Sequence, residues 1–477
     1  MMPSFVREFS RIIKKPQTLV SPVVIVSLVL VLVYFFVWIR IRFDDCSKLS
    51  VNLAYSPESS LILPFPKHIR SASNIAHTAS SAIDVVYVTA FPRNAISSLR
   101  SLCYFAGQDT IGTIHFVIPD RMASFFTSSS VLEALQCPKA SAWPGQIYTH
   151  FDFKVWSESK LVSRFTSKSH YSGTTRQMLL KLAAAFYVQT PFFLVMDSDV
   201  YARRRFNRSD LFDTKTLSKS RVNMDQTDPV SQPAKWLNHA SRVLDSRIVA
   251  DTDTFCASAS GTTKEWYKRS KETIESSIPE NPFELFKDDK SGHLVFGACR
   301  NGRSHSSHVT PYLYSKDIIL DILIPRIELI GSTISTIKTK SSSIVSYRDW
   351  QSILLDYHDA HNSHCPYYKS RLYSWTEHSL YFIASVASEA IDQYHSFSGG
   401  GITSIESSMF YPKEFEQADW NAIFKMDGKN VKKDLRPFFI VHSWFNKDIS
   451  VTDSHMSNHI PTLKDSFPSA PSPEPFY

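Results

Sequence analysis

Glycine and cysteine are scarce in this chain: 13 of its 477 residues are glycine and 6 are cysteine. So little glycine excludes a collagen-like repeat, and 43% hydrophobic residues exclude a disordered chain. No two cysteines form a C-x-x-C pair, so their spacing indicates no zinc site and leaves the disulfide pairing open. At ~100 to 200 residues per domain, the length predicts two or three domains.

Most of the chain also lacks excess positive charge. The net charge is +7, but residues 1–42 hold six basic residues and one acidic residue, which gives 6 − 1 = +5. The remaining residues therefore carry only 7 − 5 = +2. A protein that follows a phosphate backbone needs a concentrated basic face, so nucleic-acid binding is excluded as the main function.

One long uncharged run stands near the N-terminus. Residues 19–39 contain no charged side chain, and as a helix of 1.5 Å per residue they would cross a ~30 Å hydrocarbon core once. The basic residues of segment 1–18 favour a cytoplasmic N-terminus. We therefore expect a cytoplasmic tail (1–18), an uncleaved signal anchor (19–39) and a Ser- and Pro-rich stem (40–82). A cleaved signal peptide is the alternative.

This single-pass type II topology would place the rest of the chain in the lumen of the Golgi or endoplasmic reticulum. All six cysteines would then lie in an oxidising compartment. The chain has one N-glycosylation sequon, Asn207-Arg208-Ser209, which agrees with such a route but is weak evidence alone.

The lumenal part alternates strand and helix patterns. Apolar strand-like runs occupy 85–89, 113–118 and 192–196, and helical patterns occupy 95–105 and 174–188. This alternation predicts an α/β fold with a mainly parallel sheet flanked by helices, in which ligands bind beyond the carboxyl ends of the strands. We expect this domain to span 83–460, with halves at 83–204 and 205–460, and a disordered tail at 461–477.

Two carboxylates follow the apolar run FFLVM directly. Asp197 and Asp199, with the small Ser198 between them, can meet at a turn and hold one hard divalent cation whose other ligands are water and substrate phosphates. Such an ion stabilises a diphosphate as it leaves. The alternative is a pair of aspartates that caps a loop.

The segment TTRQMLLKLAAAFYVQTPFFLVMDSDV resembles the nucleotide-sugar-binding half of GT-A glycosyltransferases, where a helix carrying Gln and Lys precedes the strand ending in D-x-D. A short tail, signal anchor, stem and catalytic domain are also typical of Golgi glycosyltransferases. The resemblance implies a GT-A-like fold, a nucleotide-sugar donor, and Mn²⁺ or Mg²⁺ bound with the donor at Asp197 and Asp199. The acceptor would be a glycan, glycoprotein or glycolipid.

The helix before the strand carries further candidates for donor binding. Gln177 and Lys181 are spaced i and i+4 and so share one face of the helix. We expect Lys181 to meet a donor phosphate as a point charge, with Arg176 as a weaker candidate. A solvated lysine on a surface helix is the alternative.

A third metal ligand is expected near the end of the domain. His442 follows the strand-like run PFFIV, and several GT-A families are similar in taking a histidine ligand there. Imidazole suits Mn²⁺ better than Mg²⁺. A structural histidine is the alternative, and His308 is the rival ligand.

If the transfer inverts the anomeric centre, a base must activate the acceptor. Glu377 in WTEHSLYF is the candidate, because neighbouring aromatics can desolvate it and raise its pKa, and Trp375 would stack on a sugar. An ordinary helix start, with Thr376 as cap and Glu377 in the first turn, explains the same residues equally well.

Two other functions fit parts of the sequence. Haloacid-dehalogenase-type phosphatases also place D-x-D after a strand, but they require Thr or Val where this chain has Tyr201, and their later acidic pair would have to be Asp288-Asp289. The non-enzyme alternative is a membrane-tethered sugar-binding or scaffold protein that keeps the fold without turnover.

Overall fold

A computed structural model gives the fold. It describes residues 82–137, 151–165, 170–213, 247–249, 261–274, 311–338, 349–363, 375–388, 390, 394–396, 402, 418–424, 436–441, 456–457 and 460. The predicted tail, signal anchor, stem and C-terminal tail all lie outside these residues. Within the part of the chain that is described, no helix is both long and apolar enough to cross a bilayer.

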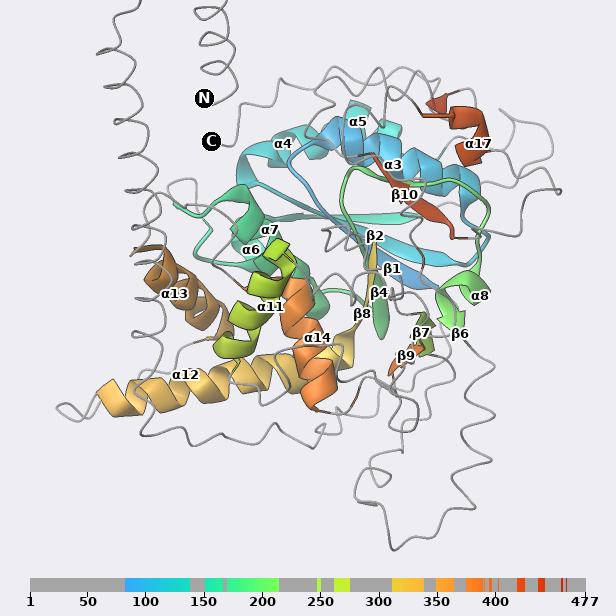
Figure 1. The fold of residues 1–477 in the computed structure, drawn as a ribbon. Helices are drawn as coiled ribbons and strands as arrows, with labels where there is room; N and C mark the ends of the chain where they lie inside the picture. The colour runs from blue at the N-terminus through green and yellow to red at the C-terminus, as the bar shows by residue number, and fades with distance from the viewer. Residues whose placement is uncertain are drawn as a thin grey trace, which may run out of the picture. The chain divides into compact units, whose positions relative to one another are not determined.

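The centre of the fold is a five-stranded sheet with the order β3-β2-β1-β4-β8 (Figure 1). Neighbours among β1 to β4 run parallel, and only β8 is antiparallel to its neighbour β4. Its strands are β1 (Ile83–Val88), β2 (Ile111–Ile118), β3 (Asp152–Ser157), β4 (Phe192–Met196) and β8 (Tyr312–Ser315). The prediction of a mixed α/β fold with a mainly parallel sheet is therefore confirmed.

Helices flank this sheet (Figure 1). Helix α7 packs on β1, α14 packs on α7, and α11 packs on α14. The longer helices are α3 (Pro92–Phe105), α5 (Ser129–Leu135), α7 (Gly173–Ala183), α11 (Gly261–Thr273), α12 (Ile324–Lys338), α13 (Trp350–Ser363) and α14 (Glu377–Ala387). The shorter ones are α4 (Ala123–Phe126), α6 (Glu158–Leu161), α8 (Arg208–Leu211) and α17 (Trp420–Phe424), and a π-helical segment, Ile318–Leu323, leads into α12.

Burial explains which strands the sequence reveals. Every residue of β1 and β4 is buried, and apart from Asp84 in β1 these strands are apolar runs. Strand β3 lies at the sheet edge, and none of its residues Asp152–Ser157 is fully buried. Its mixed sequence, DFKVWS, gave no apolar run, and for this reason β3 was missed.

A second, two-stranded sheet holds the segment that follows β4. Strand β5 (Val200–Ala202) pairs antiparallel with β10 (Phe438–Ile440). Helix α3 anchors β5 through two buried serines: the Ser98 hydroxyl donates to the carbonyl of Val200, and the amide of Ala202 donates to the Ser101 hydroxyl at 2.9 Å. The start of β5 is therefore fixed from two sides. Two short strands, β6 (Phe212–Asp213) and β9 (His395–Ser396), flank β7 (Arg247–Val249) in a third sheet.

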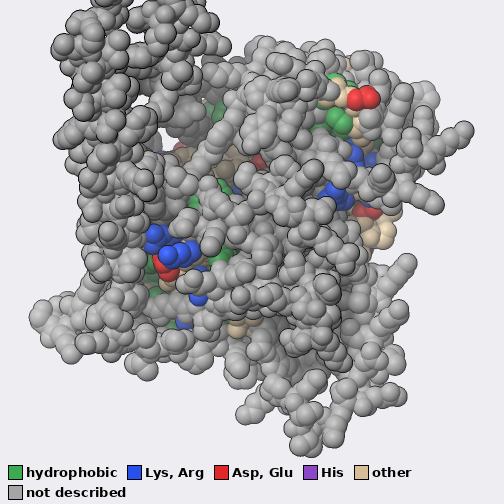
Figure 2. Space-filling view, viewed as in Figure 1, with side chains coloured by type: hydrophobic (Ala, Val, Ile, Leu, Met, Phe, Trp, Pro, Cys, Tyr) green, Lys and Arg blue, Asp and Glu red, His purple; other side chains and the backbone are tan. Residues whose placement is uncertain are grey.

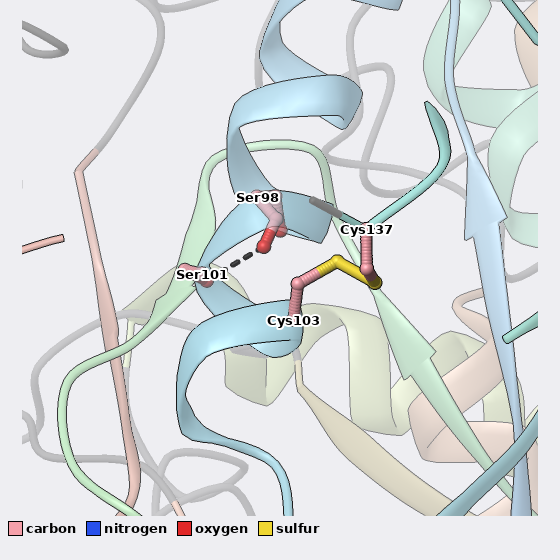
Figure 3. The surroundings of a disulfide bond; sticks show 4 residues. All are labelled: Ser98, Ser101, Cys103 and Cys137. Carbon is pink, nitrogen blue, oxygen red and sulfur yellow. Dashed lines mark hydrogen bonds between the residues drawn. A yellow bond between two sulfur atoms is a disulfide. The ribbon is translucent and has the colours of Figure 1, made fainter. Parts of the chain in front are cut away.

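A disulfide bond tethers helix α3 from its other side (Figure 3). Cys103 on α3 is joined to Cys137, which follows α5, and both side chains are buried. The spacing of the six cysteines had left this pairing open. The other four cysteines lie outside the described residues.

On the face shown in Figure 2, the charged side chains of the described residues lie in small groups that contain both basic and acidic residues. The ion pairs agree with this picture: Arg164 contacts Asp356 at 2.9 Å, and Arg204 contacts Asp210 at 2.6 Å. Such pairing agrees with the small net charge, +2, of the residues that follow position 42.

Candidate active site

The candidate site lies where the strand order changes direction. From β1 the chain continues to β2 on one side, while β4 lies on the other side of β1. At such a switch point the loops after the two strands diverge and leave a crevice for a ligand. Thr89 to Phe91 follow β1, and Asp197 to Asp199 follow β4.

The D-x-D residues form a tight turn between β4 and β5. The amide of Val200 donates to the carbonyl of Asp197 at 3.2 Å, which places Ser198 and Asp199 at the corner of the turn. The amide of Val441, just after β10, donates to the carbonyl of Asp199 at 3.0 Å. The turn is therefore held against the strand that leads to residue 442.

The carboxylate of Asp197 receives two donors from α7. Its Oδ1 atom accepts from Gln177 Nε2 at 2.6 Å and lies 3.0 Å from Lys181 Nζ. The helix begins at the capping residue Ser172, whose hydroxyl accepts from the amide of Thr175. The expectation that Gln177 and Lys181 share one face is confirmed, and that face meets the D-x-D turn.

Lys181 is a buried cation between two carboxylates. Its side chain is only 5% exposed, and its Nζ lies 3.0 Å from Asp197 Oδ1 and 3.2 Å from Glu377 Oε1. Burial alone would lower the pKa of Lys181, but the two carboxylates raise it above its ordinary value, so the ammonium stays charged. The surface-lysine alternative is therefore wrong, and its role toward a donor phosphate stays a prediction.

Arg176, the weaker phosphate candidate, is paired elsewhere. Its Nη1 atom donates to Glu158 Oε1 at 2.5 Å, and Glu158 is the residue that directly follows the carboxyl end of β3. Burial raises the pKa of Glu158 to about 6, although Arg176 opposes the shift.

Glu377 stands at the start of α14. The Thr376 hydroxyl accepts from the amide of Ser379 at 3.2 Å, so the expected helix start is present. Glu377 is also buried, and its Oε1 atom lies 3.2 Å from Lys181 Nζ and 3.4 Å from His378 Nε2. The carboxylate thus joins the cluster around Asp197, and its role as a base stays a prediction.

Trp375 lies in the core. Its side chain has no exposed surface, and its ring N–H donates to the carbonyl of Leu354 at 3.0 Å. In this conformation the ring offers no face to a sugar, because the packing that buries Trp375 covers both faces. His442 and His308 lie outside the described residues.

Two side chains beside Glu377 and one beyond β1 are further candidates that the sequence analysis does not name. His378 and Tyr314 form a buried hydrogen bond of 2.7 Å behind Glu377, and Phe91 is 41% exposed beyond β1. The position of Phe91 after a predicted strand was a usable clue. Tyr314 gave none, because its partner is distant in sequence.

The chemistry of the turn fits a hard divalent cation. Asp197 and Asp199 offer carboxylate oxygens, which Mg²⁺ and Mn²⁺ prefer. Within the described ranges, no group of three or more His, Cys, Asp or Glu side chains is arranged to hold a metal ion. A complete ligand set would need residues or substrate atoms beyond these.

Comparison with known families gives one match. Residues 79–463 match the model of DUF6492, described as a family of unknown function. The chain belongs to this family. The match covers the whole predicted domain 83–460 of this DUF6492 member, including β1, the D-x-D turn and β10. Among curated proteins, no sequence matches it.

Two solved structures align weakly with this DUF6492 member. The apo form of mouse xyloside xylosyltransferase 1 is 10% identical, with 75% of this chain and 97% of that chain covered and a TM-score of 0.29. The galactosyltransferase LgtC, in complex with donor and acceptor sugar analogs, is 10% identical, with 80% and 97% covered and a TM-score of 0.33. Such TM-scores do not establish a shared fold, and the function proposed below depends on the site's own residues.

Proposed function

We propose that this DUF6492 member is a metal-dependent glycosyltransferase that moves a sugar from a nucleotide-diphosphate sugar to a glycan, glycoprotein or glycolipid. The observation that carries the proposal is the D-x-D turn at the switch point of a mainly parallel sheet. There Asp197 is fixed by Gln177 and Lys181, while Asp199 occupies the corner of the turn.

The turn and the residue after β10 would hold the metal. Asp197, Asp199 and His442 are the proposed ligands, and the hydrogen bond from Val441 to Asp199 supports the third, because His442 is the next residue in the chain. A bound divalent ion would neutralise the leaving diphosphate.

The chain's own residues orient the substrates. Gln177 and Lys181 fix one oxygen of Asp197, so the carboxylate does not need to be ordered when the donor binds. The ring of Phe91, which is 41% exposed just beyond the carboxyl end of β1, would stack on the nucleobase. If the transfer inverts configuration, Glu377 would take the proton from the acceptor hydroxyl, and acceptor binding would have to expose its side chain, which is only 4% exposed in this structure.

We further propose that this domain works in the lumen of the Golgi or endoplasmic reticulum, anchored by residues 19–39. The buried disulfide between Cys103 and Cys137 supports this location, since disulfides persist in oxidising compartments.

A panel of nucleotide sugars, read as thermal shift with and without Mn²⁺, tests the proposal on the full-length chain. We expect one donor to raise the melting temperature in the presence of Mn²⁺, because a ligand that binds only the folded state stabilises it. Asp199→Asn should remove this increase, whereas Asp109→Asn, at an exposed position in the turn between α3 and β2, should keep it. No shift with any nucleotide sugar would contradict the proposal.

Product analysis with the same donor separates the alternatives. Formation of a glycosylated acceptor or a free sugar supports a transferase. Binding without any product would instead favour a sugar-binding or scaffold protein, and an aspartyl-phosphate trapped on Asp197 would favour a phosphatase.

A further inference from the structure

Both ends of the D-x-D turn are tied to one buried tyrosine of β1. Strand register pairs Tyr87 with Met196, the last residue of β4 and the one before the turn. The Tyr87 hydroxyl also lies 2.9 Å from the Ser98 hydroxyl on α3, and Ser98 donates to the carbonyl of Val200, the first residue after the turn. All four residues are fully buried. Tyr87 therefore fixes where the turn begins and, through Ser98, where it ends.

The direction of these hydrogen bonds is fixed by their chemistry. The carbonyl of Val200 can only accept, so the single hydroxyl proton of Ser98 points to it. The Ser98 oxygen is then left to accept, and Tyr87 must be the donor. Burial raises the pKa of the Tyr87 hydroxyl above its ordinary value, so this donor keeps its proton near neutral pH. The hydrogen bonds from Tyr87 to Ser98 to Val200 therefore have one arrangement.

Helix α3 also completes the edge of β5 that β10 does not cover. In a strand the backbone groups of alternate residues point to the same edge, and the carbonyl of Asp199 points toward β10, where it accepts from the residue after that strand. Val200 and Ala202 point the other way, toward Ser98 and Ser101. The Ser101 hydroxyl accepts from the amide of Ala202 and donates its own proton to the carbonyl of Ser98 at 2.6 Å (Figure 3). Two serine side chains therefore take the place of a neighbouring strand.

The carboxylates between these fixed ends can reach a ligand. Asp197 and Asp199 are partly exposed, unlike the residues directly before and after the turn. A turn fixed at both ends keeps its two carboxylates in place before an ion binds, so less order has to be created on binding. We propose that Tyr87, Ser98 and Ser101 are positioning residues that hold the D-x-D turn in its ion-binding conformation. This inference rests on the proposed function, because it requires the turn to bind a divalent ion.

The chain supplies two matched controls. Ser97, next to Ser98 on α3, is also fully buried, and its hydroxyl has no hydrogen-bond partner within the described residues. Thr190 lies near the amino end of β4, and its buried hydroxyl accepts from the amide of Asp84 and donates to the carbonyl of Phe192 at 2.6 Å. Thr190→Val therefore removes two buried hydrogen bonds, as Ser98→Ala does, but at the end of the strand away from the turn.

The experiment measures Mn²⁺ binding to the folded full-length chain, from the electron paramagnetic resonance signal of the Mn²⁺ left in solution. Without the Ser98 hydroxyl, the buried carbonyl after the turn loses its donor, and that end of the turn is no longer fixed. We expect Ser98→Ala to weaken Mn²⁺ binding about tenfold, the lower end of the loss seen when partners that orient metal ligands are removed. Ser101→Ala and Tyr87→Phe should each weaken it about threefold, since the bond from Ser98 remains. Ser97→Ala and Thr190→Val should leave it unchanged.

Amide hydrogen exchange of the metal-free chain gives a second readout. In Ser101→Ala the amide of Ala202 loses its acceptor, and in Ser98→Ala the turn loses one of its two fixed ends. Peptides that cover 197–203 should therefore exchange at least about fivefold faster in both variants than in wild type, with no change in Ser97→Ala.

Three results would overturn the inference while the proposed function stands. The first is folded Ser98→Ala and Tyr87→Phe that bind Mn²⁺ as tightly as wild type. The second is Thr190→Val that loses as much affinity as Ser98→Ala, which would show that the hydroxyls only stabilise the fold. The third is unchanged exchange of the 197–203 peptides in Ser98→Ala and Ser101→Ala. If the wild type itself binds no Mn²⁺, the proposed function fails, and the inference falls with it even where exchange confirms the hydrogen bonds.

Discussion

Removing the ammonium of Lys181 tests the electrostatics of the site most severely. In Lys181→Met the apolar stem is kept, but Asp197 and Glu377 lose the charge between them. The Glu377 side chain is only 4% exposed, so water cannot replace the lost partner there, whereas Asp197 is 28% exposed and partly solvated. Breaking a buried ion pair from one side costs about 3–5 kcal/mol, and we expect the free energy of unfolding to fall by that amount at pH 7.

The reasoning predicts a specific rescue. Glu377→Gln removes the buried carboxylate that Lys181→Met leaves unpaired, so the double variant should be more stable than the sum of the single changes by about 1–3 kcal/mol. Urea unfolding of the full-length chain measures all three variants, with Lys268→Met on an exposed part of α11 as the control, expected within about 0.5 kcal/mol of wild type. Additive effects, or a loss below about 1 kcal/mol in Lys181→Met, would refute the buried ion pair.

Three further predictions concern other parts of the chain. Burial raises the pKa of Glu158 from 4.5 to about 6, so its contribution to stability is present below pH 4.5 and lost as the pH rises through 6. Over that window the free energy of unfolding of the wild type, measured in urea, should fall by about 2 kcal/mol relative to Glu158→Gln (1.5 units at about 1.36 kcal/mol each). Replacing Cys103 and Cys137 together by Ala should cost about 2–4 kcal/mol in the same assay, because the bond closes a loop of sequence separation 34; no loss would show that the bond is absent. If residues 83–460 are lumenal, full-length protein made in eukaryotic cells should carry a glycan on the exposed Asn207. A glycosidase should remove this glycan, and Ser209→Ala should prevent its attachment. An unmodified Asn207 would count against that topology.

The centre of the fold could be predicted from sequence because most residues of its strands are buried and apolar. Strand β4 was predicted with its observed bounds, Phe192–Met196, and the predicted strands at 85–89 and 113–118 differ from β1 and β2 by two residues or fewer at each end. Helix α7 was predicted with the correct face toward the D-x-D turn, because the i, i+4 spacing of Gln177 and Lys181 is a local property.

The site's charge pairing could not be predicted, because it depends on contacts between distant parts of the chain. Gln177, Lys181, Asp197 and Glu377 were each selected as candidates, but nothing in the sequence indicates that one lysine lies between two of the carboxylates. Trp375 shows the opposite error: an aromatic beside a candidate base was expected to stack on sugar, and it is a core residue bonded to Leu354. Local sequence does not distinguish an aromatic that lines a pocket from one that packs beneath it.

The most direct measurement of the central claim is sugar transfer by the purified full-length chain with Mn²⁺, compared between wild type and Asp199→Ala. Asp199 stands at the corner of the turn, and its structural hydrogen bond to Val441 uses the backbone carbonyl, which the substitution keeps. We predict transfer or hydrolysis of one nucleotide sugar by the wild type, loss of this activity when the metal is chelated, and a decrease of at least about a hundredfold in the variant. Full activity in Asp199→Ala would contradict the account.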